Sequence, residues 1–258
     1  FSIIDKLPNY IIPLGLGEEK FPSNWMDEKS GKNISYLNSN YGELTGIYWI
    51  WKNVIKDMSD DDNIGNCHYR KLWLDKLYMT KQKTSFDSLF KHLLKTEDIN
   101  RQNFDVIQVQ PIEFKSKNLL DDFLDIHKTD LLKKSLNFLD NDIRDSFLIH
   151  LNQSKLYPLN MFITKVKYFR EYCEVLFPWL DKCFKYCEDK NLCTKYNIRL
   201  PAFLAERFTS FWFSQKVKKV HFSYARLGSF FLSNNINKTL NPIKIPLTFR
   251  MYPTLHKY

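Results

Sequence analysis

Hydrophobic and polar positions along the chain follow two patterns, one typical of strands and one typical of helices. Short apolar runs bounded by turn residues predict strands or extended segments at 1–5, 10–17, 63–70, 104–111, 157–164 and 220–224. Longer stretches with helical periodicity predict helices at 84–98, 167–188 and 201–215, and one or two amphipathic helices over 119–152. Strands that alternate with helices predict an α/β fold, a mostly parallel central sheet with helices on both faces. Ligands of such sheets bind beyond the carboxyl ends of the strands.

The stretch NSNYGELTGIYWIWKN, residues 38–53, is apolar on almost every side and predicts a largely buried helix over about 41–56. Asn40 followed by Glu43 matches a capping box, which makes Asn40 the expected N-cap. Glu43 is open to two interpretations, a capping role or contact with hydroxyl groups of a ligand. Tyr48, Trp49 and Trp51 continue away from the helix start and are expected in the core. The polar segment before this helix, residues 21–40, predicts a loop of the kind that closes over a ligand.

Composition excludes several classes of site and of protein. An aromatic content of 16% with seven glycines among 258 residues is typical of an ordered globular chain, and neither GxGxxG nor GxxxxGK[ST] occurs. The cysteines are odd in number and lack CxxC spacing, which favours reduced structural thiols: Cys67, Cys173, Cys183, Cys187 and Cys193. No apolar run reaches the roughly 18 residues of a membrane span, and no signal peptide opens the sequence, so a cytoplasmic location is expected.

The net charge of +9 is concentrated at the end of the chain. Lys216 to Tyr258 contains eight Lys or Arg residues and no Asp or Glu. We therefore divide the chain into a main domain, 1–235, and a basic aromatic extension, 236–258. The extension is consistent with a nucleic-acid surface, with contact to an anionic membrane, or with a solvated tail.

Four segments in this order resemble one family: DEKSGKNISYLNSNYGELTGIYWIWKN, DNIGNCHYRKLW, YPLNMFI and FLAERFTSFW. The family comprises bacterial capsular and exopolysaccharide glycosyltransferases first catalogued as a domain of unknown function, and the resemblance covers about residues 1–225. Two positions depart from its pattern. Asp5-Lys6 stands where the family has a His-Lys pair, and HYRK stands where it has two arginines. The resemblance implies a GT-A-like fold that transfers a sugar from a nucleotide sugar to a growing polysaccharide.

In such a transferase the donor nucleotide is expected at the start of the first long helix and after the strand 63–70, at Asn33, Asn38, Tyr41, Glu43, Thr45, His68, Tyr69 and Arg70. Amides and free backbone N–H groups recognise a base or ribose, and Tyr41 is available for stacking. Arg70 binds phosphate in bidentate fashion, so a fixed cation offsets the diphosphate charge. Metal-independent transfer is therefore favoured, with no metal ligands and no cofactor, although Mn²⁺ or Mg²⁺ stays open. The alternative for His68 and Arg70 is a buried pair that ties strand to loop.

The acceptor is expected at Asn160, Met161 and Arg207, although Asn160 beside Pro158 also suits a simple turn. An inverting transferase needs a carboxylate to remove the acceptor proton, and Glu206 is the first candidate for this general base, with Asp27 second. Glu206 also suits an ordinary position in the first turns of a helix, and a retaining reaction needs no such base. His127 is expected on a helix surface, with contact to the acceptor as the alternative.

The expected function is that of a glycosyltransferase acting on a capsular or exopolysaccharide acceptor. We expect this acceptor to be lipid-linked, and we expect peripheral contact of the protein with the inner face of an anionic membrane. Its partners are then a nucleotide sugar and a polysaccharide or lipid-linked oligosaccharide, with no nucleic acid. Two alternatives remain. One is transfer of another nucleotide-activated group onto the same polysaccharides, and the other is a basic nucleic-acid-binding module.

Overall fold

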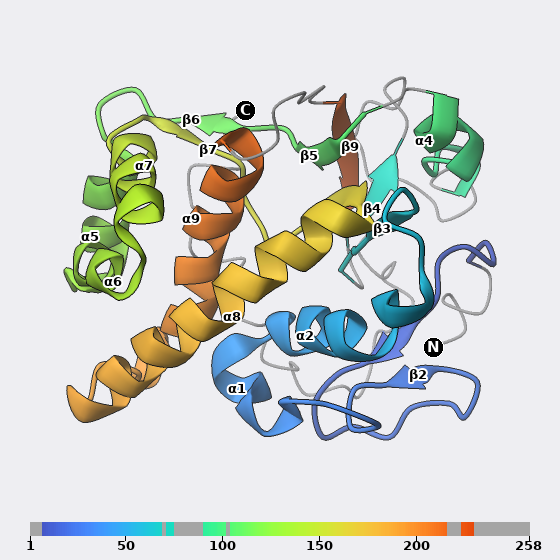
Figure 1. The fold of residues 1–258 in the computed structure, drawn as a ribbon, viewed down its shortest axis with the longest axis horizontal. Coiled ribbons are helices and arrows are strands. Elements are labelled where there is room, and N and C mark those ends of the chain that lie inside the picture. The colour runs from blue at the N-terminus through green and yellow to red at the C-terminus, as the bar shows by residue number, and fades with distance from the viewer. Residues whose placement is uncertain (1–6, 69–70, 75–89, 102–103, 216–222, 230–258) are drawn as a thin grey trace, which may run out of the picture.

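A computed structural model describes residues 7–68, 71–74, 90–101, 104–215 and 223–229. Within these residues the centre of the fold is a five-stranded sheet in the order β3-β8-β5-β9-β4 (Figure 1). Its strands are β3 (Asn63–Gly65), β4 (Lys71–Leu74), β5 (Val106–Val109), β8 (Phe162–Lys165) and β9 (Ser223–Ser229). Two small sheets accompany it, β1 (Leu14–Gly15) with parallel β2 (Met26–Asp27), and β6 (Ile112–Glu113) with antiparallel β7 (Lys155–Leu156).

The central sheet is mostly antiparallel, so the prediction of a mostly parallel sheet was wrong. β8 runs antiparallel to both β3 and β5, β4 runs antiparallel to β9, and only the β5–β9 pair within this sheet is parallel. The reason lies in the excursion between β5 and β8. Its two ends, β6 and β7, pair with each other in antiparallel fashion. The chain therefore returns beside the strand it left and in the opposite direction, whatever helices lie in between.

Helices surround the sheet, and three of them, α5, α6 and α7, belong to the segment between β5 and β8. The helices of the described residues are α1 (Asn38–Tyr41), α2 (Leu44–Asn53), α4 (Thr96–Arg101), α5 (Leu119–His127), α6 (Leu131–Ser135), α7 (Asn141–Leu151), α8 (Val166–Asp189) and α9 (Leu200–Gln215). Short 3-10 turns join them: η2 (Ser35–Leu37), η3 (Ile55–Asp57), η4 (Leu136–Phe138) and η5 (Lys195–Arg199). The helices predicted over 167–188 and 201–215 are confirmed, whereas 119–152, predicted as one or two helices, divides into α5, α6 and α7. Figure 1 shows α5, α6 and α7 gathered on one side of α9, with α8 crossing in front of it.

Apolar side chains cover both faces of the sheet, as alternation along its strands requires. Val106 and Phe162 belong to the main core, which also takes in the apolar residues of α8 and α9. Ile107 and Ile163 point to the other face, where a second cluster includes Trp73. Helices do cover both faces, because Ile99 of α4 packs against this second cluster.

Gly42 breaks the single helix predicted over 41–56 into α1 and α2. Its φ of 55° and ψ of −130° suit glycine and end α1, so Asn40 lies inside a helix and is no N-cap. The Asn40 amide instead donates to the carbonyl of Ile198 at 2.9 Å. The expectation for the aromatic residues of α2 is confirmed, since Trp49 is 8% exposed and Tyr48 and Trp51 pack against the main core.

Other expectations have mixed outcomes. The strand predicted at 157–164 begins only at Phe162, because Leu159 adopts a left-handed conformation with φ of 71°. All five cysteines are free thiols. The segments 1–5 and 75–89 and the extension 236–258 lie outside the described residues, so the domain division stays a prediction.

Candidate active site

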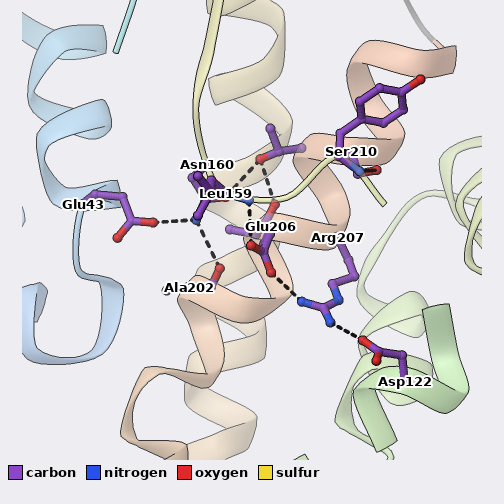
Figure 2. A network of polar contacts seen from close by, with 11 residues as sticks. Glu43, Asp122, Leu159, Asn160, Ala202, Glu206, Arg207 and Ser210 are labelled. Carbon is purple, nitrogen blue, oxygen red and sulfur yellow. Dashed lines mark hydrogen bonds and ion pairs between the residues drawn. The ribbon is translucent and has the colours of Figure 1, made fainter. Parts of the chain in front are cut away.

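Glu43 and Asn160 meet at one end of the central sheet, where β3 and β5 end and β8 begins. Asn160 lies two residues before the start of β8. The antiparallel register places that start beside the ends of β3 and β5, where Gly65 pairs with Ile163 and Gln108 with Phe162. Glu43 occupies the N-cap position of α2, but its side chain makes no cap hydrogen bond. It accepts a hydrogen bond from Asn160 instead, from Nδ2 to Oε1 at 2.8 Å (Figure 2). The interpretation of Glu43 as a helix cap is thereby excluded.

The Asn160 side chain is fully occupied by the protein. It is 2% exposed, and its Nδ2 also donates to the carbonyl of Ala202 at 3.3 Å. Its Oδ1 accepts from the hydroxyl of Thr209 at 3.1 Å. Its backbone carbonyl accepts from Asn66 Nδ2 at 2.5 Å. An acceptor hydroxyl would have to displace one of these partners, so Asn160 holds α2, β8 and α9 together rather than offering an open amide.

Below Asn160 lies a buried ion-paired group of three residues, shown in Figure 2. Glu206 Oε1 accepts from the backbone N–H of Leu159 at 2.6 Å, and Oε2 accepts from Arg207 at 2.5 Å. Arg207 also pairs with Asp122 of α5 at 2.8 Å. The residues Glu206, Arg207 and Asp122 are 6%, 1% and 5% exposed. The group fixes the left-handed Leu159 turn before β8 and ties α5 to α9.

His68 and Lys71 bring two basic groups to the same end of the sheet. Their backbones form a two-residue bridge, with N···O distances of 3.1 and 2.9 Å. His68 Nε2 is buried and finds no hydrogen-bond partner among the described residues. The pKa of His68 is lowered, mainly by burial and in part by the Lys71 charge. The carboxylates of Glu43 and Glu206 oppose this change. Burial also lowers the pKa of Lys71, with Glu206 opposing. Two carboxylates and two basic groups therefore share one electrostatic environment.

A second polar cluster lies at the start of α1 and contains Asn38 and Thr45. Asn38 Nδ2 donates to Thr45 Oγ1 at 2.9 Å and to Glu28 Oε1 at 3.3 Å. Glu28 is 0% exposed and also accepts from the backbone N–H of Gly17 at 2.6 Å. Burial raises the pKa of Glu28, while its bonds with Thr45 and Gly17 oppose that rise. This cluster fastens the loop before α1 to the start of α2.

Asn33 and Asp27 organise that loop locally. Asn33 donates to the carbonyls of Lys29 and Gly31, both at 3.1 Å, and accepts from Ser35. Asp27 accepts from the backbone N–H of Lys29 at 2.9 Å. Neither side chain makes a hydrogen bond to Glu43, Asn160 or Glu206 in the described structure.

Two predicted site residues prove to be apolar core residues, a third is buried in ion pairs, and two are not described. Tyr41 is 2% exposed and meets Phe184 edge to face at 5.7 Å between ring centroids, so its ring is not available to stack on a base. Met161 is 1% exposed within the second apolar cluster. Arg207, also expected at the acceptor, has its guanidinium committed to the two carboxylates. Tyr69 and Arg70 lie outside the described residues.

The prediction that His127 lies on a helix surface was wrong, because the residue is only 2% exposed. Its Nδ1 lies 3.3 Å from Asn197 Oδ1, and its ring stacks on Phe203 at 4.6 Å between centroids. Burial lowers the pKa of His127 to about 3, with the Arg207 charge adding to the effect.

Sequence reasoning missed four polar residues of these clusters: Glu28, Asn66, Lys71 and Asp122. Lys71 had a signal, because it directly follows the HYR segment. Asp122 had none, since an acidic residue in the first turn of a helix is ordinary. Asn66 shapes the edge of the sheet, with Nδ2 bonded to Asn160 and Oδ1 accepting from the N–H of Phe162 at 3.1 Å.

The described residues contain no group of three or more His, Cys, Asp or Glu side chains placed to hold a metal ion. The metal independence expected from the sequence therefore stays a prediction. None of the helices in the described part of the chain has the length and apolar character needed to cross a bilayer.

Comparison with known proteins identifies a family that matches most of this chain. The family model described as a domain of unknown function, DUF4422, matches residues 4–218. No curated protein matches the chain. Among solved structures, the apo form of the WbbM bifunctional glycosyltransferase is similar in fold, with a TM-score of 0.61 and 20% sequence identity. The similarity covers 90% of this chain and 47% of that one, so this chain spans about half the length of WbbM.

Proposed function

The chain belongs to the DUF4422 family, and we propose that it is a glycosyltransferase that moves a sugar from a nucleotide sugar to a capsular or exopolysaccharide acceptor. One observation carries the proposal. On a fold similar to that of a bifunctional glycosyltransferase, Glu43, His68, Lys71 and Glu206 gather where β3 and β5 end. Sugar transfer from a diphosphate needs such a combination, because a carboxylate manages the acceptor proton and cations stabilise the leaving group.

In this proposal the donor diphosphate lies against the segment after β3. His68 supplies an unpartnered buried nitrogen among the described residues, and Lys71 adds a cation two strands away in the sheet order from β5. Tyr69 and Arg70, between them in sequence, are proposed to complete the donor contacts. Fixed cations reduce the need for a divalent metal at the diphosphate, so metal-independent transfer is part of the proposal.

The residues predicted at the acceptor take a different role. Asn160, Met161 and Arg207 are each no more than 2% exposed. They form the floor beneath the site and fix its geometry, and we propose that the acceptor contacts groups above them. The lipid-linked nature of the acceptor and the contact with an anionic membrane remain proposals that depend on the extension 236–258.

Donor binding is the direct test. The purified chain is screened by thermal shift against nucleoside diphosphates and nucleotide sugars, with and without Mn²⁺ or Mg²⁺, because a ligand that binds only the folded state raises Tm. We expect a metal-independent shift with one nucleotide family. Arg70→Ala should abolish it, whereas Arg144→Ala, at a surface position on α7, should leave it intact. A shift that needs metal would overturn the cationic donor site, and no shift with any nucleotide would count against the function.

Product mass separates sugar transfer from the transfer of another activated group, such as a phosphoryl moiety. In this assay the protein is incubated with the donor identified in the screen and with a capsular or exopolysaccharide oligosaccharide as acceptor. A mass increase of one sugar residue supports the proposal, and an increase of one phosphoryl group favours the alternative.

A further inference from the structure

The two carboxylates at the site differ in how the protein engages them. Both oxygens of Glu206 are bonded, one to the N–H of Leu159 and one to Arg207, and the residue is 6% exposed. Glu43 is partly exposed, and only its Oε1 is bonded to another described residue, Asn160. Figure 2 shows its second oxygen turned away from Asn160. A base must have an oxygen open to the substrate, and Glu43 meets this requirement where Glu206 does not.

Asn160 also fixes the orientation of the Glu43 carboxylate. Its Nδ2 donates at 2.8 Å to Oε1, and its own position is set by Thr209, Ala202 and Asn66. Thr209 is held in turn by the hydroxyl of Tyr172 at 2.7 Å. A carboxylate with one oxygen held by the protein and the other open suits a proton acceptor. The rotamer of the Glu43 side chain is then fixed before the substrate arrives.

We infer that Glu43 is the catalytic base of the transfer, in place of Glu206, and that Asn160 is its positioning residue. The inference rests on the proposed function. The acceptor hydroxyl donates its proton to Glu43 Oε2 while its oxygen forms a bond to the anomeric carbon of the donor. The bond from that carbon to the diphosphate oxygen breaks, and the electron pair leaves with the nucleoside diphosphate. The proton then passes from Glu43 to solvent, and the new glycosidic bond has inverted configuration.

His68 and Tyr172 sense the charge of Glu43, and Lys71 senses that of Glu206. His68 follows β3, Lys71 opens β4, Glu206 with Arg207 lies on α9, and the phenol of Tyr172 lies on α8. Arg207 is placed to neutralise Glu206 and Asp122 rather than Glu43. Glu43 is thus the carboxylate of this group that pairs with no cation among the described residues.

Glu43→Gln tests this assignment. Glutamine keeps an oxygen that accepts from Asn160 but cannot take up the proton. We expect kcat to fall on the order of 100-fold or more, with the donor Kd, the acceptor KM and Tm close to those of the wild type. Glu113→Gln, at an exposed position on β6, is the matched control and should leave all four quantities unchanged. The anomeric configuration of the wild-type product is read by NMR in the same assays.

Each outcome decides the inference. A loss confined to kcat, together with an inverted product, supports it. An unchanged kcat, a loss of donor binding, or a retained anomeric configuration overturns it, as does a well-folded Glu206→Gln variant that loses more activity than Glu43→Gln. Wild-type protein that binds no nucleotide sugar overturns the proposed function as well, whereas wild-type transfer with normal transfer by Glu43→Gln defeats the inference alone.

Discussion

Replacing Arg207 by leucine tests whether the buried ion-paired group holds the floor of the site. Arg207 is 1% exposed and bridges Asp122 and Glu206 at 2.8 and 2.5 Å. The substitution removes the cation and leaves both carboxylates buried. Breaking a buried ion pair by removing one partner costs about 3–5 kcal/mol, because the remaining charge is neither paired nor hydrated. That is a large fraction of a typical folding free energy of roughly 5–15 kcal/mol.

Two comparison variants separate the loss of the cation from other effects. Arg144 pairs with Asp145 at 2.9 Å, with side chains 37% and 65% exposed. Arg144→Leu should cost only about 0–1 kcal/mol, since an exposed pair gains little in water. Adding Asp122→Asn and Glu206→Gln to Arg207→Leu removes the unpaired charges, and we expect this triple variant to regain much of the lost stability.

Urea unfolding at pH 7 and pH 5 measures these differences in the free energy of unfolding. Burial raises the pKa of Asp122 and the Arg207 charge opposes the rise, so loss of Arg207 should raise that pKa further. A carboxyl group with a raised folded pKa destabilises the protein above that pKa and ceases to do so as the pH falls through it. The deficit of Arg207→Leu should therefore narrow from pH 7 to pH 5. A loss no larger than that of Arg144→Leu, or a deficit that widens with acid, would refute the reasoning.

Three further outcomes follow. Burial lowers the pKa of His127 to about 3, so the unfolded state takes up a proton below about pH 6.5 that the folded state does not. Between pH 7 and pH 5 this difference in proton uptake lowers the free energy of unfolding of the wild type by about 2 kcal/mol. The free energy of unfolding of His127→Gln should therefore fall by about 2 kcal/mol less than that of the wild type over the same interval. Gly42→Ala should cost about 1–3 kcal/mol, measured by urea unfolding, because Gly42 has a φ of 55°; no loss would contradict the strained backbone. Because burial raises the pKa of Glu28, wild-type stability should fall as the pH rises through that pKa, and Tm of Glu28→Gln should lack this fall; parallel pH curves for the two proteins would exclude it.

Local patterns in the sequence predicted most helices but not how the strands pair. Periodicity over 167–188 and 201–215 describes faces that a single helix must bury, and the observed bounds Val166–Asp189 and Leu200–Gln215 agree within about two residues. Strand direction depends instead on where a long excursion returns. The pairing of β6 with β7, which sets that return, involves only two residues on each strand and leaves no periodic signal.

The site was predictable in part, and the limit has a physical origin. Glu43, Asn160 and Glu206 were all recognised as candidates, and the structure brings them together. Their partners could not be read from the sequence, because the bond between Glu43 and Asn160 spans 117 positions and that between Arg207 and Asp122 spans 85. Whether a polar side chain is open to a ligand or committed to a neighbour depends on such distant partners.

That distinction explains why the roles of the candidate residues change once the fold is known. A buried polar group must be bonded, so a motif rich in amides and charges supplies partners for its own members before it supplies contacts for a substrate. Asn160 and Arg207 meet this need for Glu43, Glu206 and Asp122. The oxygen of Glu43 that faces no described partner is the group this network leaves open. For that reason the loss of activity in Glu43→Gln and the loss of stability in Arg207→Leu should be separable, although both residues belong to one connected polar network.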